Sequence, residues 1–144
     1  MGVRYQRAGR AQDAVRAYDV AIRYAPESGE AWHGKATALY HLQRWSEAIA
    51  AYREALRRMP RSALTWYALG LAERDAGHRE AAVEALEAAV RLNERNIAYR
   101  LELGDAWASL ARWTEAIEQW TAILALQPGQ PDALQRLRDA DAEP

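Results

Sequence analysis

The sequence repeats itself with a period of 34 residues. At this offset three prolines, four alanines and two glycines fall in register: Pro26, Pro60 and Pro128; Ala14, Ala48, Ala82 and Ala116; and Gly70 and Gly104. A fixed period in this range is typical of a solenoid, in which each repeat buries its apolar face on its neighbours. Such a chain needs no single central core.

Each repeat reads as two amphipathic helices joined by a short turn. In residues 29–62 apolar residues recur at helical spacing, as at Trp32, Ala36 and Leu39. Pro60 ends the second helix, because proline lacks an N–H and restricts the residue before it. We therefore predict three complete hairpins, with helices at 29–42 and 45–58, at 63–76 and 79–92, and at 97–110 and 113–126.

Capping residues support these boundaries. Ser28, Ser62 and Asn96 precede the first helices and suit N-caps, and Ser46 and Thr114 stand where second helices begin. Gly77 fits a left-handed turn between helices. Gln43 and Ala111 occupy the same slot, where a left-handed conformation would destabilise the chain by about 1 kcal/mol relative to glycine.

The repeated residues resemble the tetratricopeptide repeat motif, W-x2-L-G-x2-Y followed by A-x3-F, A and P. The third repeat carries Trp66, Leu69, Gly70, Ala82, Leu86 and Ala89, and the fourth carries Leu103, Gly104, Trp107, Ala116, Trp120 and Pro128. The resemblance covers essentially the whole chain. It implies an all-α, right-handed superhelical solenoid of helix-turn-helix repeats with a concave groove lined by first helices. The implied function is a non-catalytic scaffold for protein–protein interaction.

The two ends depart from the complete repeat. We expect residues 1–144 to form one domain, with complete repeats at 29–62, 63–96 and 97–130. Residues 1–28 hold a partial repeat, with a stub helix at 1–8, a turn at Gly9 and a second helix at 11–24. The chain is either a fragment of a longer array or begins with a half-built repeat, and we favour the fragment. Pro131 suits the start of a capping helix at 131–140, with Leu134 and Leu137 facing the fourth repeat and 141–144 as a tail.

Composition and the absence of known motifs argue against several classes of function. The 19 basic and 20 acidic residues argue against a general nucleic-acid partner. The sequence shows no apolar run of membrane-spanning length and no secretory signal, which favours a cytoplasmic location without membrane insertion. His33 and His41 lie about 12 Å apart along one helix, too far to share a metal ion. We expect no cofactor, no metal and no enzymatic activity, because no nucleophile, base or phosphate-loop motif occurs.

Aromatic and charged residues at repeat positions have structural interpretations. The six tryptophans fall in slots that pack helices together, so we interpret them as core rather than as a binding site. The slots that hold Leu39 and Trp45 in the second repeat hold Glu73 and Arg79 in the third. We predict a salt bridge between these two charged side chains.

Mapping the first helices onto the implied groove yields a set of candidate peptide-binding residues. On the third repeat, Leu64, Tyr67 and Leu71 form one stripe, which the core does not need because Trp66, Leu69 and Gly70 already face it. The full set is His33, Thr37, Tyr40, Leu64, Tyr67, Leu71, Arg74, Leu101 and Asp105. It suits an apolar or amphipathic peptide. Alternatively, Leu64 and Tyr67 pack across to neighbouring first helices.

Charge is distributed unevenly along the chain. Residues 1–62 carry 11 basic and 6 acidic side chains, whereas residues 63–144 carry 8 basic and 14 acidic ones. This asymmetry is either ordinary variation among exposed faces or a device for head-to-tail association through the repeat ends. A self-association module of a larger repeat protein is therefore the alternative function.

Overall fold

The computed structural model describes residues 2–141, and of residues 2–7 the backbone alone. Within these residues the chain is helical, with no strand. The helices are α1 (Gly2–Tyr24), α2 (Gly29–His41), α3 (Trp45–Arg58), α4 (Ala63–Asp75), α5 (Arg79–Leu92), α6 (Ile97–Ser109), α7 (Trp113–Leu126) and α8 (Pro131–Asp141). The second helices have the predicted bounds, and the first helices end one residue earlier than predicted.

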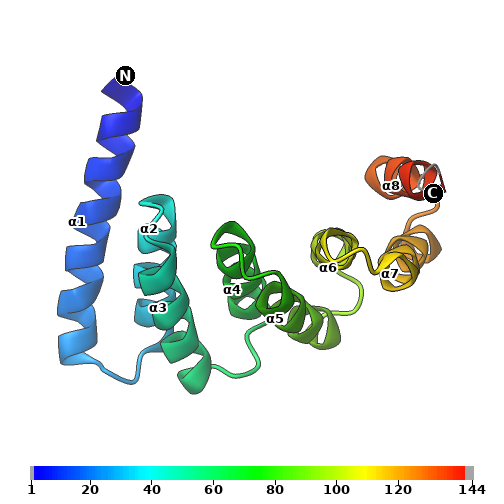
Figure 1. Cartoon of the computed structure of the whole chain (residues 1–144). Coiled ribbons are helices and arrows are strands. Elements are labelled where there is room, and N and C mark those ends of the chain that lie inside the picture. The colour runs from blue at the N-terminus through cyan, green and yellow to red at the C-terminus, as the bar shows by residue number, and fades with distance from the viewer. Residues whose placement is uncertain (1, 142–144) are drawn as a thin grey trace.

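The helices form an arch of successive hairpins (Figure 1). The pairs α2–α3, α4–α5 and α6–α7 pack closely, and each second helix also packs on the next first helix. Helices α2, α4, α6 and α8 follow the inner side of the arch, and α3, α5 and α7 follow its outer side (Figure 1). The expected all-α solenoid of helix pairs is confirmed.

Local capping explains where the helices begin and end. The side chains of Ser28, Ser62 and Asn96 accept hydrogen bonds from the backbone N–H groups three residues on, as predicted. Ser46 and Thr114 are not N-caps, because α3 and α7 already begin at Trp45 and Trp113. The turns use the left-handed conformation: φ is 59° at Gln43, 57° at Ala111 and 87° at Gly77.

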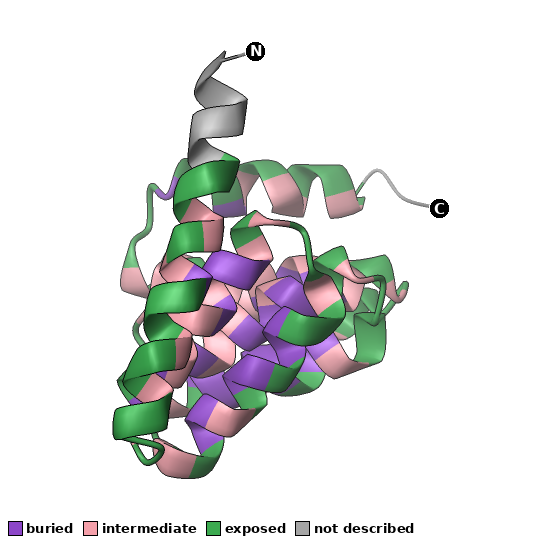
Figure 2. Ribbon diagram, turned by 90° about the vertical axis from the view of Figure 1, so that its left-hand side faces the viewer, coloured by how far each residue is buried: buried purple, intermediate pink, exposed green. Residues whose placement is uncertain are grey.

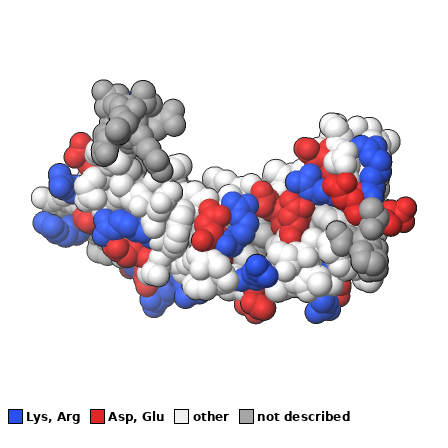
Figure 3. All heavy atoms as spheres, turned by 45° about the horizontal axis from the view of Figure 1, so that its top comes forward, with Lys and Arg blue, Asp and Glu red and all other residues white. Residues whose placement is uncertain are grey.

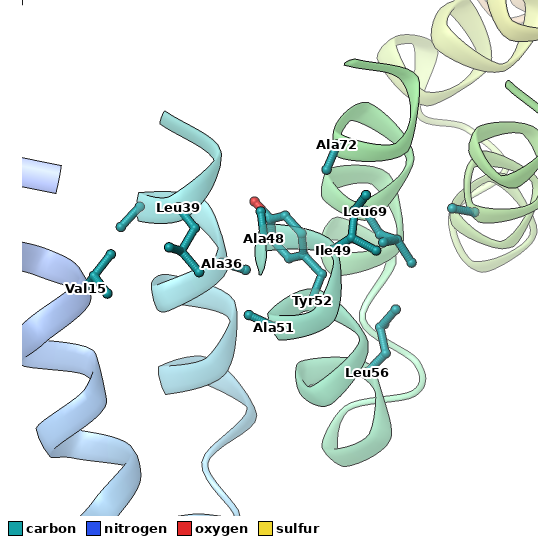
Figure 4. Close-up of a cluster of buried hydrophobic side chains, with 12 residues drawn as sticks. Val15, Ala36, Leu39, Ala48, Ile49, Ala51, Tyr52, Leu56, Leu69 and Ala72 are labelled. Atoms are coloured by element: carbon teal, nitrogen blue, oxygen red, sulfur yellow. The ribbon is translucent and has the colours of Figure 1, made fainter. Parts of the chain in front are cut away.

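Buried side chains lie between the helices in a series of adjoining clusters. Figure 4 shows the first cluster, in which Ala36 of α2 points toward Ala48 and Tyr52 of α3. Further clusters form around Leu86 and Leu103 and around Trp120 and Ile123. Buried residues line the contacts between helices and exposed residues line the outside (Figure 2). The core is therefore continuous along the array rather than central.

The tryptophans pack between helices with one partial exception. Trp120 is 3% exposed, whereas Trp113 is 37% exposed at the outer start of α7. The indole N–H groups of Trp32 and Trp66 donate to the carbonyl oxygens of Pro26 and Pro60. These bonds fix each first helix to the turn that precedes it.

The predicted turn at Gly9 is wrong, because α1 runs straight from Gly2 to Tyr24. Gly9 occupies the same slot as Gly77, yet it is helical. A chain reversal at Gly9 would leave only about two turns of helix, residues 1–8, to pack back onto the rest of α1. A continuous helix instead keeps all of its backbone hydrogen bonds.

The predicted salt bridge between Glu73 and Arg79 is also wrong. Arg53 of α3 and His78 contact the Glu73 carboxylate, at 2.8 and 2.6 Å. Arg79 instead donates to the backbone oxygen of Ser109. Glu73 is buried, and its partners come from the preceding repeat and from the turn that follows α4.

At the C-terminal end, α8 covers the fourth repeat. Ala133 is fully buried there, and Leu137 packs against the same cluster as predicted. Leu134 is half-buried and lies outside that cluster. The opposite side of α8 carries charged residues, as suits the end of a stack. Of the expected tail, residues 142–144 lie outside the described residues.

Candidate functional site

The candidate site lies on the inner side of the arch, where α2, α4 and α6 run side by side. Leu64 at the start of α4 is 58% exposed, more than the other exposed aliphatic side chains Val20 and Ile117, at 47% and 38%. Tyr67 and Leu71, one and two turns further along α4, are half-buried. The predicted stripe is thus most exposed at Leu64.

Tyr67 packs across to the next first helix. Its ring centroid lies 4.7 Å from that of Tyr99 on α6, with the two ring planes tilted by 30°. Leu101, also on α6, packs against the cluster around Trp120. Tyr67 and Leu101 therefore present only part of their surfaces to solvent.

Polar contacts join each first helix to the next. The Tyr40 hydroxyl on α2 donates a hydrogen bond to Asp75 on α4, and Arg74 donates to Glu102 on α6 at 2.8 Å. Asp105 on α6 then accepts two hydrogen bonds from Arg136 on α8, at 2.6 and 2.9 Å. We call these contacts the inner-face ladder. Figure 3 shows charged side chains of both signs gathered toward the α8 end of one face.

The α2 residues of the predicted set form a second polar group. His33 Nδ1 lies 2.9 Å from the Thr65 hydroxyl of α4, and the Thr37 hydroxyl lies 3.0 Å from that of Tyr52. The His33 ring meets the Tyr52 ring edge-on at 5.4 Å. His33 and Thr37 are thereby tied to the core, while both remain half-buried.

Several side chains of this surface have shifted pKa values, among them Tyr40 and His33. Burial, reinforced by the hydrogen bond to Asp75, raises the pKa of Tyr40 to about 12. Burial lowers the pKa of His33. Both shifts favour the neutral form, so these residues can donate or accept hydrogen bonds without adding charge.

The structure brings the nine predicted residues to neighbouring helices, and it adds partners that the sequence did not single out. Thr65, Tyr99, Glu102 and Arg136 each complete a contact described above. The one sequence feature that could have indicated the ion pairs is that successive first helices carry residues of opposite charge. The separations are 35 residues for Tyr40 and Asp75, 28 for Arg74 and Glu102, and 31 for Asp105 and Arg136, so no fixed offset identifies the pairs.

Two further observations bear on function. Among the described residues, no group of three or more histidine or acidic side chains could hold a metal ion. No helix in this part of the chain has the length and apolar character needed to cross a membrane.

Helix pairs stacked into an open arch, with first helices lining its inner side, define an α-solenoid of the helical-hairpin class. The tetratricopeptide repeat profile matches residues 1–63 and 67–131, so the chain belongs to the tetratricopeptide repeat family. No curated protein matches the chain by sequence.

Solved structures of the same fold are numerous. A crystal structure of MamA superposes with a TM-score of 0.85 at 25% identity, covering 92% of this chain and 77% of that one. YrrB, described as having an unusual peptide-binding site, gives 0.77 at 26% identity, covering 87% and 64%. The first repeat domain of Spaghetti (RPAP3), solved with an HSP90 peptide, gives 0.73 at 20% identity, covering 79% and 90%, and shares the fold.

Proposed function

We propose that this protein is a non-catalytic scaffold that holds a peptide or helical segment of a partner protein on its inner face. The exposure of Leu64, an apolar side chain at the start of the central first helix α4, is the observation that carries the proposal. The peptide-binding site named for YrrB and the peptide bound to RPAP3 support the same use of the fold.

The apolar part of the contact comes from the α4 stripe. Leu64 offers the largest free surface, and Tyr67 and Leu71 extend it along the helix. Tyr40 and Leu101 flank the stripe on the two neighbouring helices. An amphipathic segment would lay its apolar side along this line, which matches the groove-binding mode of helical peptides.

Polar selectivity comes from residues beside the stripe: His33, Thr37, Arg74 and Asp105. Arg74 and Asp105 are already paired in the inner-face ladder, but their side chains are 44% and 38% exposed. A partner can therefore bond to their free edges without breaking the ladder. Neutral His33 adds a hydrogen-bonding group at the α2 side of the face.

A peptide-display selection followed by one pair of variants tests the proposal. Leu64→Asp places a charge in the apolar stripe and should weaken a selected peptide at least about tenfold. Ile117→Asp is the matched control, because Ile117 is 38% exposed on the outer helix α7. Failure to select any peptide, or equal loss in both variants, would contradict the proposal.

A further inference from the structure

The second half of α1 exposes residues whose counterparts are buried in every later repeat. Tyr18 is 36% exposed, Ala21 is exposed and Ala14 is half-buried. The counterparts at 34-residue intervals are at most 3% exposed: Ala48, Ala82 and Ala116; Tyr52, Leu86 and Trp120; and Ala55, Ala89 and Ile123. The same sequence positions therefore lack a cover only at the start of the array.

In the later repeats this cover is the first helix of the same repeat. A Cβ added at Gly70 would lie 2.7 Å from Leu86 Cγ, and one added at Gly104 would lie 2.4 Å from Trp120 Nε1. The first helix therefore lies so close to the second helix at this point that a side chain larger than glycine would clash. Because α1 continues straight through Gly9, no described residue of this chain covers Ala14, Tyr18 and Ala21 in that way.

The vacant position is a groove between α1 and α2, with a volume of about 980 Å³. Ala11, Ala14 and Tyr18 line its α1 side, and Gly34 and Ala38 line its α2 side. The Tyr18 ring lies against Gly34, where a Cβ would come within 2.2 Å of it. The groove is therefore floored by alanines and one larger apolar residue, Tyr18. The surface that contacts the first helix in the later repeats likewise combines alanines with a larger apolar residue: Tyr52, Leu86 or Trp120.

The charge of the groove indicates the chemistry of its occupant. Arg10 supplies the positive charge, the imidazoles of His33 and His41 add hydrogen-bonding groups, and none of the described lining residues is acidic. In the third repeat, His78 stands at the position of Arg10, and it contacts the Glu73 carboxylate of the first helix at 2.6 Å. An acidic residue on the occupant would meet Arg10 in the same way.

We propose that this groove binds an amphipathic helix of another protein, which completes the first repeat. The bound helix runs antiparallel to α1, with a glycine or alanine against Tyr18. A carboxylate three residues further along that helix pairs with Arg10, following the spacing of Gly70 and Glu73. This interaction goes beyond the proposed peptide site: the groove shares His33 and Thr37 with that site, but the Leu64 stripe contributes nothing to it.

A fluorescein-labelled peptide with the sequence of residues 62–77 of this chain serves as the probe, measured by fluorescence anisotropy against the full 144-residue chain. We expect saturable binding of one peptide per chain. Ala14→Leu fills the groove and should weaken binding at least about tenfold. Ala17→Leu is the matched control, since Ala17 is exposed on the same helix outside the groove. No binding, or equal binding to both variants, would overturn the proposal.

Changes in the probe test the two specific contacts. A Gly70→Leu peptide should not bind, because its side chain would collide with Tyr18. A Glu73→Gln peptide should bind about tenfold more weakly to the natural chain. To an Arg10→Ala chain, the two forms of the peptide should bind equally. A Glu73→Gln effect that persists without Arg10 would overturn the assigned pairing.

Other occupants of the groove have distinct signatures. Sedimentation of the chain alone would show a dimer that the peptide dissociates, if a second copy filled the groove. The chain has no cysteine, so Gly2→Cys with Tyr18→Cys reports whether its own first residues fold back. Observation of either that dimer or the intrachain disulfide would overturn the proposal that a helix of another protein occupies the groove. Leu64→Asp should leave probe binding unchanged, which separates this result from a failure of the inner-face site.

Discussion

Arg53 on α3 donates a hydrogen bond of 2.8 Å to the carboxylate of Glu73 on α4 and so joins two successive repeats. The Glu73 side chain is 2% exposed, and it occupies the slot that Leu39 and Trp107 fill in the neighbouring repeats. His78 lies 2.6 Å from the second carboxylate oxygen. A charged residue is therefore accommodated at an apolar position by two partners outside its own helix.

Removing Arg53 should destabilise the fold more than removing a neighbouring arginine. Arg53→Ala leaves a buried carboxylate with one partner fewer and should lower the free energy of unfolding by about 1–2 kcal/mol. The loss stays below that of a fully buried pair because Arg53 is itself 63% exposed. Arg57→Ala, which breaks the exposed pair with Glu54, should leave the free energy of unfolding nearly unchanged. Chemical denaturation measures both, and equal losses would contradict the argument.

Two helical glycines should respond oppositely to alanine. Gly104→Ala places a Cβ 2.4 Å from Trp120 Nε1 and should lower the free energy of unfolding by about 2 kcal/mol through overpacking. Gly9→Ala meets no atom within 4 Å and should raise it by about 0.5–1 kcal/mol, because alanine favours the helix. Thermal and denaturant unfolding check both values. A destabilising Gly9→Ala would indicate a turn rather than a continuous α1.

The turn after α6 contains a strained backbone conformation at Ala111, which a substitution can relieve. Ala111 has a φ of 57°, which an alanine adopts at a cost of about 1 kcal/mol relative to glycine. Ala111→Gly should therefore stabilise the chain by about that amount. Ala50→Gly, at an exposed helical position in the middle of α3, should destabilise it by about 0.5–1 kcal/mol. Denaturation midpoints measure both effects. If both substitutions shift the midpoint in the same direction, this account is wrong.

The sequence predicted the features that depend on local chemistry. The period, the second-helix bounds and the caps at Ser28, Ser62 and Asn96 follow from residues close together in the chain. The left-handed turns at Gln43 and Ala111 followed from their register with Gly77. Because these features recur in each repeat, each copy reinforced the interpretation of the others.

What the sequence could not predict depends on packing between distant residues. Glu73 was matched with Arg79, six positions away, whereas its arginine partner Arg53 comes from the preceding repeat. The inner-face ladder has no constant separation, since it depends on how successive first helices are staggered. The turn at Gly9 matched the repeat pattern, but a hairpin forms only where both of its helices bury enough surface.

Stability should depend on pH through His33, whose pKa is lowered by burial. The unfolded chain, with a histidine pKa of about 6.5, binds a proton more readily than the folded chain. The stabilising contribution is thus complete above about pH 6.5, and it is lost as the pH falls toward the lower pKa of the folded state. The natural chain should lose stability relative to His33→Gln between about pH 7 and 5, by at most about 1.4 kcal/mol per pH unit. His41→Gln removes an exposed imidazole from the same helix and separates the effect of burial from the loss of a histidine. Parallel pH curves for the natural chain and His33→Gln would show that the imidazole of His33 does not titrate differently on folding.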